Sequence, residues 1–342
     1  MKKSVVVSVC VCLSISLSSF ANETDSVSSY LSKAQNFQKE RRWKNAEDLY
    51  LKALSLQPNN YEVLESLSGY YLELNKLSEA RETMTKMHTL RPNDQKSLAE
   101  LARLSFNLKK FNEAISYYSE LNKLSPSEEI DIKLGKAYSA TEDYGKAIAS
   151  FENAIKKNPK NSESLYNLGR SYNEIENVKK ALPYYQEAIA LQPSRYMWIY
   201  EVAYLYISLG DNNSAIEYFE KASAAGMPRD LVFLENLGTL QIATKDYEKG
   251  IKTLEEILLK KPNSPKILKD IAQTYYKNQK YNKSVEAWEK VLAADETDYR
   301  SMYMLGMTYQ KMNKIEKGRE ICDKAISMDN SLAKLRTEKF NF

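Results

Sequence analysis

Small and apolar residues recur along the chain with a constant period. A small residue recurs nine times at nearly equal intervals, with successive spacings of 34, 34, 33, 34, 34, 35, 34 and 34 residues. These residues are Ala46, Ala80, Ala114, Ala147, Ala181, Ala215, Gly250, Ser284 and Gly318. A second small residue stands 12 positions before each of these: Ala34, Ser68, Ala102, Gly135, Gly169, Ala203, Gly238, Ala272 and Gly306. A period of this length is typical of tandem repeats. The pattern predicts nine repeats over residues 27–332.

Each repeat has the pattern of two helices. Leu168 and Tyr172, for example, are four positions apart and therefore share one face of a helix. A proline, which cannot extend a helix, recurs near the end of six repeats: Pro58, Pro92, Pro126, Pro159, Pro193 and Pro262. We expect the two small residues of a repeat to meet where its helices cross, because small side chains let the backbones approach closely. The predicted fold class is all-α.

The repeat resembles the tetratricopeptide repeat, a helix–turn–helix unit of 34 residues. That family has small residues at positions 8 and 20, aromatic residues at positions 11 and 24, and proline at position 32. The resemblance implies a right-handed α-solenoid in which the first helix of each repeat lines the concave face. The implied boundaries are 27–60, 61–94, 95–127, 128–161, 162–195, 196–230, 231–264, 265–298 and 299–332.

Three departures from the family pattern change local expectations. Tryptophan is absent from position 4, where Asp131 interrupts a position that is otherwise mostly apolar. The sixth repeat has 35 residues, and we expect Gly226 to end its second helix in the left-handed conformation. The last two repeats lack the proline, having Glu296 and Asn330 in its place. These departures affect local curvature rather than the predicted fold.

Residues 1–21 have the pattern of a secretory signal peptide. Lys2 and Lys3 precede a short apolar stretch, and small residues stand before the expected cleavage after Ala21. The apolar stretch is too short to span a bilayer comfortably; an uncleaved anchor is the alternative. We therefore expect export to a bacterial periplasm, with export to the outside as the alternative, and no transmembrane helix in the mature chain.

The two ends of the repeat array are short. Residues 22–26 form a brief N-terminal segment, and residues 333–342 are predicted to form a partial C-terminal cap. A terminal repeat needs a polar outer face. The alternative is an exposed end that pairs with a second copy or a partner.

Charge and composition exclude several classes of function. The chain has 49 Lys and Arg against 45 Asp and Glu, and removal of the two leader lysines leaves 47 − 45 = +2, too little for a dedicated nucleic-acid binder. His88 is the sole histidine, and Cys322 is the sole cysteine after the leader. We expect no disulfide, no metal site, no cofactor and no catalytic residues, with His88 in a structural role at the surface and Cys322 in the core.

The resemblance also implies which residues face a ligand. On the concave face, the expected partner-binding residues of the middle repeats are Lys133, Lys136, Tyr166, Asn167, Arg170, Asn173, Tyr200 and Tyr204. A secondary groove in the last two repeats has Lys266, Lys269, Arg300 and Tyr303. The three cations of the middle repeats are expected to converge on an anionic group, the asparagines to bind a peptide backbone, and the tyrosines to act as anchors.

Two functions remain open at this point. The first is an exported, non-catalytic scaffold that binds a protein segment on its concave face and acts in the assembly or maintenance of envelope complexes. The second is an accessory protein that binds or helps to export a carbohydrate or envelope polymer. The Lys–Asn–Asn–Lys–Arg clamp of one family subclass is not reproduced, since Ile132 and Lys136 stand where it would begin. Capture of a terminal carboxylate is therefore not expected.

Overall fold

The computed structural model describes residues 26–336. The predicted signal peptide and the end of the predicted cap, residues 337–342, lie outside the described residues. The chain divides into two compact units, Met1–Ala188 and Ile189–Phe342, and each is described here by itself. The sequence period runs through this division without a change of spacing.

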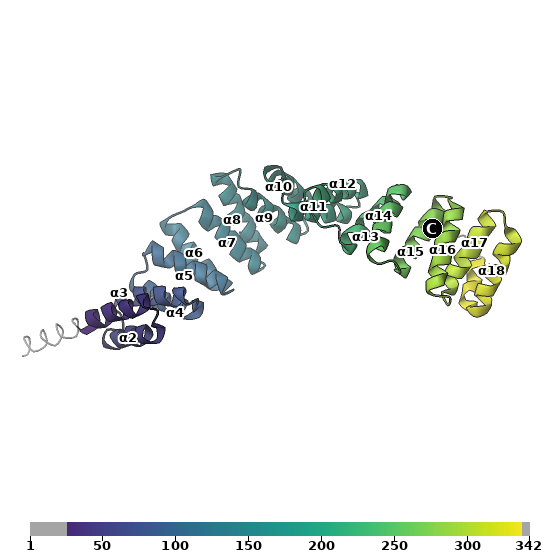
Figure 1. The fold of residues 1–342 in the computed structure, drawn as a ribbon. Coiled ribbons are helices and arrows are strands. Elements are labelled where there is room, and N and C mark those ends of the chain that lie inside the picture. Colours follow the sequence, from purple (N-terminus) through teal and green to yellow (C-terminus); the bar gives the residue numbers. More distant parts are fainter. Residues whose placement is uncertain (1–25, 337–342) are drawn as a thin grey trace, which may run out of the picture. The chain divides into compact units, whose positions relative to one another are not determined.

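The described part of the first unit consists of paired helices. After a helix over residues 26–39 come α2 (Trp43–Leu56), α3 (Tyr61–Glu73), α4 (Leu77–Leu90), α5 (Gln95–Asn107), α6 (Phe111–Leu124), α7 (Glu128–Ala140), α8 (Tyr144–Lys157), α9 (Ser162–Glu174) and α10 (Val178–Leu191). The last three residues of α10 belong to the second unit. Within the first unit, neighbouring helices pack side by side (Figure 1).

The second unit continues the same alternation. Its helices are α11 (Tyr196–Ser208), α12 (Asn212–Ala224), α13 (Leu231–Ala243), α14 (Tyr247–Lys260), α15 (Pro265–Lys277), α16 (Tyr281–Ala294), α17 (Tyr299–Lys311) and α18 (Ile315–Met328), followed by the 3₁₀ helix η1 (Asn330–Arg336). Residues 26–336 contain no β-strand. The predicted all-α solenoid of helix pairs is confirmed.

The turn inside each helix pair contains one residue in the left-handed conformation. Gly210 adopts it with φ of 75°. In the other eight pairs the residue is not glycine: Arg41, Asn75, Lys109, Glu142, Glu176, Lys245, Gln279 and Asn313, with φ between 56° and 67°. This conformation ends the first helix as an αL cap. Gly226, with φ of 102°, ends α12 in the same way, as predicted.

The two small residues of each repeat lie in the core, where the paired helices cross. All eighteen of them are buried. At Gly135, an added Cβ would lie 2.6 Å from the ring of Phe151, and at Gly306 it would lie 2.7 Å from the backbone oxygen of Gly318. These distances are too short for a larger side chain, which confirms the physical reason for the small residues.

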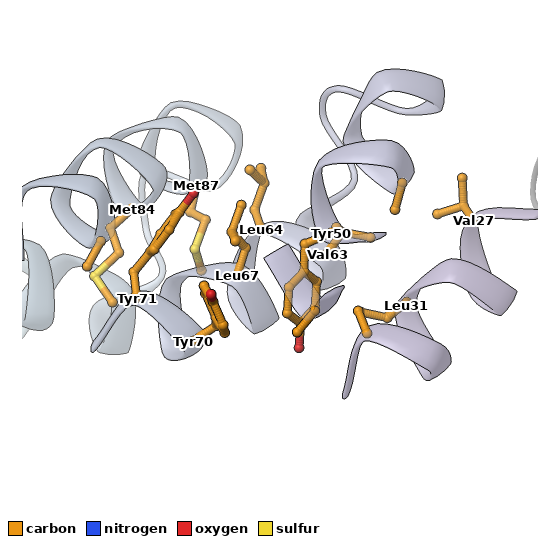
Figure 2. Close-up of a cluster of buried hydrophobic side chains, with 14 of the residues drawn as sticks. Val27, Leu31, Tyr50, Val63, Leu64, Leu67, Tyr70, Tyr71, Met84 and Met87 are labelled. Carbon is orange, nitrogen blue, oxygen red and sulfur yellow. The ribbon is translucent and has the colours of Figure 1, made fainter. Parts of the chain in front are cut away.

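Aromatic side chains fill the space between successive pairs. In the first repeats, the rings of Tyr50 and Tyr70 are 5.8 Å apart, and both are buried among aliphatic side chains (Figure 2). The hydroxyl of Tyr70 donates to the backbone oxygen of Trp43 at 2.9 Å, so its polar atom is satisfied inside the core. Burial of this kind accounts for many of the 25 tyrosines.

His88 and Cys322 both have structural positions. His88 Nε2 lies 3.1 Å from Glu120 Oε2, and its ring packs edge-on against Tyr117, so it joins α4 to α6 instead of lying free at the surface. Cys322 is buried, as predicted, and this burial raises the pKa of its thiol to about 11. A thiol with such a pKa is largely protonated at neutral pH and is a poor nucleophile.

Candidate partner-binding surface

The predicted partner-binding residues are carried by the first helices of three pairs. Lys133 and Lys136 lie on α7, and Tyr166, Asn167, Arg170 and Asn173 lie on α9. These six belong to the first unit, whereas Tyr200 and Tyr204 lie on α11 of the second. We call the side carried by the first helices the first-helix face.

The cations of the first unit do not converge on one site. Lys136 Nζ lies 2.5 Å from Glu163 Oε1 of α9, and Arg170 Nε lies 3.8 Å from Glu174 Oε1 on its own helix. Lys133 is half-buried and makes no hydrogen bond or ion pair with another described residue. The expected shared anion site is therefore wrong as stated, because two of its three cations have carboxylate partners of their own.

The neutral residues of α9 are partly engaged within the protein. Asn167 Nδ2 donates to the backbone oxygen of Glu163 at 2.8 Å, which leaves its second amide hydrogen and Oδ1 for a peptide backbone. The ring of Tyr166 packs edge-on against Tyr185 with centroids 5.5 Å apart. Asn173 is half-buried at the last turn of α9. This part of the first-helix face thus offers Arg170 as its most accessible group.

In the second unit, the two predicted tyrosines belong to an ordered aromatic network. The hydroxyl oxygens of Tyr200 and Tyr204 are 2.9 Å apart, and Asn236 of α13 donates its Nδ2 hydrogen to Tyr204 at 2.7 Å. The ring of Tyr200 stacks on Phe233 at 5.9 Å with an interplanar angle of 16°. Burial, and then the hydrogen bond with Tyr204, raises the pKa of Tyr200. Both rings are therefore held in place, and Tyr200 keeps its hydroxyl hydrogen at neutral pH.

Exposed apolar side chains lie beside this network. Met197 precedes Tyr200 by three positions and is 49% exposed, and Val232 precedes Asn236 by four positions and is 62% exposed. These spacings place each residue on the same helix face as its neighbour in the network. We call Met197, Tyr200, Tyr204, Val232 and Asn236 the α11–α13 surface. Sequence reasoning missed three of its members, Met197, Val232 and Asn236, although all three lie on first helices, which were expected to line the binding face.

The four residues predicted for the secondary groove differ in burial and in their partners. Lys266 is ion-paired with Glu235, and Lys269 Nζ lies 2.5 Å from Asp298 Oδ2. Arg300 is exposed and makes no ion pair with another described residue. Tyr303 is 2% exposed and packs with Cys322 and Leu332. The prediction that Tyr303 lines a groove is therefore wrong, because Leu332 of η1, at the end of the last repeat, packs in the same buried cluster.

The described residues offer no site for a metal ion. Between residues 26 and 336, no group of three or more His, Cys, Asp or Glu side chains is arranged to hold one. In the same range, no helix has the length and apolar character needed to cross a membrane.

Comparison with known proteins gives family matches along most of the chain. Tetratricopeptide repeat models match residues 31–95, 95–128, 132–196, 206–273 and 299–332. No curated protein matches the chain.

Similar solved structures include the "Crystal structure of MamA" (23% identity, TM-score 0.45, 46% of this chain and 93% of that one). "MamA 41-end from Desulfovibrio magneticus RS-1" has 20% identity and a TM-score of 0.45, over 48% of this chain and 94% of that one. YrrB, described as "a TPR protein with an unusual peptide-binding site", has 23% identity and a TM-score of 0.43, over 57% of this chain and 100% of that one. The matches to the repeat models, taken together, show that the chain belongs to the tetratricopeptide repeat family.

Proposed function

We propose that the protein is an exported, non-catalytic scaffold that binds a segment of a partner protein on its first-helix face. Tetratricopeptide repeat proteins are protein-interaction scaffolds as a family, which supports the general class of function. The observation that carries the proposal is the α11–α13 surface. It combines two ordered tyrosines with exposed apolar side chains, the composition of an interface anchor.

The order of this surface favours binding of a folded or extended protein segment. A tyrosine provides a large apolar area with a polar tip. Because hydrogen bonds and stacking already hold Tyr200 and Tyr204, little side-chain entropy is lost when a partner packs against them. Met197 and Val232 extend the apolar contact on both helices. A helix or strand with an apolar edge would bury all four side chains.

The cellular role is inferred from the N-terminal pattern. Residues 1–21 favour export to a periplasm, or alternatively to the outside. An exported scaffold without catalytic residues suits the assembly or maintenance of envelope complexes. Cell fractionation, with N-terminal sequencing of the exported chain, tests this part. A mature N-terminus at Asn22 is expected, and a full-length chain retained in the cytoplasm would contradict it.

The binding site is tested by photo-crosslinking in the native cell. A photoreactive amino acid replaces Tyr204, which is 39% exposed, and adducts are identified by mass spectrometry. We expect discrete protein adducts from this position. The control replaces Leu259, which is 84% exposed on the second helix α14 and belongs to no predicted site. Equal labelling from both positions would remove the α11–α13 surface as the binding site, and the absence of protein adducts would favour a carbohydrate ligand.

The contribution of the first unit is tested with Arg170→Glu. Arg170 is exposed and its contact with Glu174 is long, so the substitution is expected to change the free energy of unfolding by less than about 0.5 kcal/mol. It should nevertheless lower the adduct yield from a photoreactive amino acid placed at Tyr166 on the same helix. Lys52→Glu, on the exposed side of the second helix α2, serves as the charge-matched control. An unchanged yield in Arg170→Glu would remove α9 from the binding surface.

A further inference from the structure

A polar pocket in the first unit lies apart from every predicted binding residue. Its volume is about 640 Å³, within the usual range for small-ligand sites. The helix over residues 26–39 contributes Gln35, Gln38 and Lys39, the following turn contributes Arg41, and Ser66 and Glu73 come from α3. The hydroxyl end of Tyr50 reaches the pocket from α2. The pocket thus joins the first two repeats.

Hydrogen bonds hold the side chains that line this pocket. The buried Tyr50 donates its hydroxyl hydrogen to Gln38 Oε1 at 2.7 Å, and Gln38 Nε2 in turn donates to Glu73 Oε2 at 2.7 Å. Gln35 Nε2 donates to Ser66 Oγ at 3.2 Å. The series of hydrogen bonds from Tyr50 through Gln38 to Glu73 starts at a core residue. The orientations of the Gln38 amide and the Glu73 carboxylate are therefore fixed before a ligand binds.

Several hydrogen-bonding groups of the pocket remain available to a ligand. Glu73 Oε1 and Gln35 Oε1 are acceptors without a partner among the described residues, and each glutamine keeps one amide hydrogen. Lys39 and Arg41 are exposed and make no ion pair with another described residue. The pocket therefore combines two cations that have no ion pair among the described residues, the Glu73 carboxylate, and the neutral amide and hydroxyl groups of Gln35, Gln38 and Ser66.

We propose that this pocket binds an acidic sugar unit, such as a uronic acid residue of a glycan. The sugar carboxylate would pair with Arg41 and Lys39, for which the planar guanidinium of Arg41 is well suited. Sugar hydroxyls both donate and accept, so they match Glu73, Gln35, Gln38 and Ser66. The inference concerns a site in the first unit and does not depend on the α11–α13 surface of the second.

The residues that line the pocket argue against two other kinds of ligand, a peptide side chain and a phosphate group. A peptide anchor needs apolar wall area, but every lining side chain ends in a polar group, and the ring of Tyr50 is buried in the core. A phosphate dianion would be repelled by the Glu73 carboxylate, which has no cation partner among the described residues. A singly charged ligand rich in hydroxyl groups is repelled less than a dianion, and it can place hydroxyl groups beside Glu73 and its carboxylate beside Arg41 and Lys39.

Isothermal titration of the purified full chain tests the proposal with three probes of similar size: trigalacturonate, maltotriose and a triglutamate peptide. Trigalacturonate is expected to bind at least about tenfold more tightly than the other two, since a charge-assisted hydrogen bond provides a difference of that order. Equal binding of maltotriose, preferential binding of triglutamate, or no binding of trigalacturonate would each overturn the proposal.

Matched variants then locate the site. Arg41→Asn removes the guanidinium, and asparagine tolerates the left-handed conformation at this turn, where φ is 58°. Lys109→Asn makes the same kind of change at the equivalent turn two repeats further on, where φ is also 58°. We expect Arg41→Asn to weaken trigalacturonate binding about tenfold and Lys109→Asn to leave it unchanged. Equal effects of the two variants would place the ligand elsewhere.

Discussion

Lys157→Met is expected to lower the free energy of unfolding by about 3 kcal/mol. In the parent protein, the Lys157 ammonium lies 2.7 Å from Asp131 Oδ2, and Asp131 is only 2% exposed. The one other partner of this carboxylate in the described part of the chain is Asn122, whose Nδ2 donates to Oδ1 at 3.2 Å. Removal of Lys157 therefore leaves a buried negative charge with a single neutral donor.

The measurement has to be local because repeats contact mainly their neighbours. Hydrogen exchange of the α7 and α8 amides in Lys157→Met reports the stability of this part of the first unit. Lys156→Met, at the adjacent exposed position of α8, is the control and should change stability by less than about 0.5 kcal/mol.

Replacement of the other member of this ion pair, Asp131, should change the free energy of unfolding much less. Asp131→Leu places leucine where other repeats have Leu64, Leu98 and Leu165, and Lys157 is exposed enough to remain hydrated. A buried ion pair contributes little beyond an apolar replacement of similar volume, so this variant should lie within about 1 kcal/mol of the parent. Equal losses in Asp131→Leu and Lys157→Met would contradict the argument that the unpaired carboxylate is the source of the cost.

The repeat pattern predicts the helices well, because the close crossing of a helix pair and its buried faces each require a particular type of residue. Small residues mark the crossing and apolar residues mark the buried faces, as at Gly169 and Leu168. The left-handed turn inside each pair has no such signal. It is occupied by residues as different as Arg41, Lys109 and Glu142, and only Gly210, Asn75 and Asn313 have a type favoured in that conformation. There, the connection between two packed helices determines the backbone, and the side chain adapts.

The candidate site is less predictable than the fold, since it depends on contacts between repeats. The family register identifies Lys136 and Asn167 as surface residues, but Glu163 engages both of them. The same register misplaces Tyr303, which is buried with Cys322 and Leu332 at the end of the last repeat. Asp131 is a similar case: the sequence shows an acidic residue at an apolar position, while its partner lies 26 residues further on. A period describes what repeats share and cannot describe such individual pairs.

Gly306→Leu is expected to cost about 3 kcal/mol, the largest effect we predict for a core substitution. A Cβ at this position would lie 2.6 Å from Cys322 Sγ and 2.7 Å from the backbone oxygen of Gly318. A side chain can rotate away from such a contact, but the Gly318 oxygen belongs to α18 and moves only if α17 and α18 separate. Hydrogen exchange of α17 and α18 amides measures the loss locally.

Two other helical glycines provide a graded control with the same substitution. At Gly169, a Cβ would lie 3.0 Å from the ring of Tyr185 and 3.1 Å from the backbone oxygen of Ala181, so Gly169→Leu should cost roughly 1–3 kcal/mol. At Gly69 nothing lies within 4 Å, and Gly69→Leu should stabilise α3 by about 0.5–1 kcal/mol, because leucine is the better helix former. The sign should therefore reverse between Gly306 and Gly69. A similar loss at all three positions would mean that general crowding, and not the close crossing of two backbones, explains why small residues occupy these places.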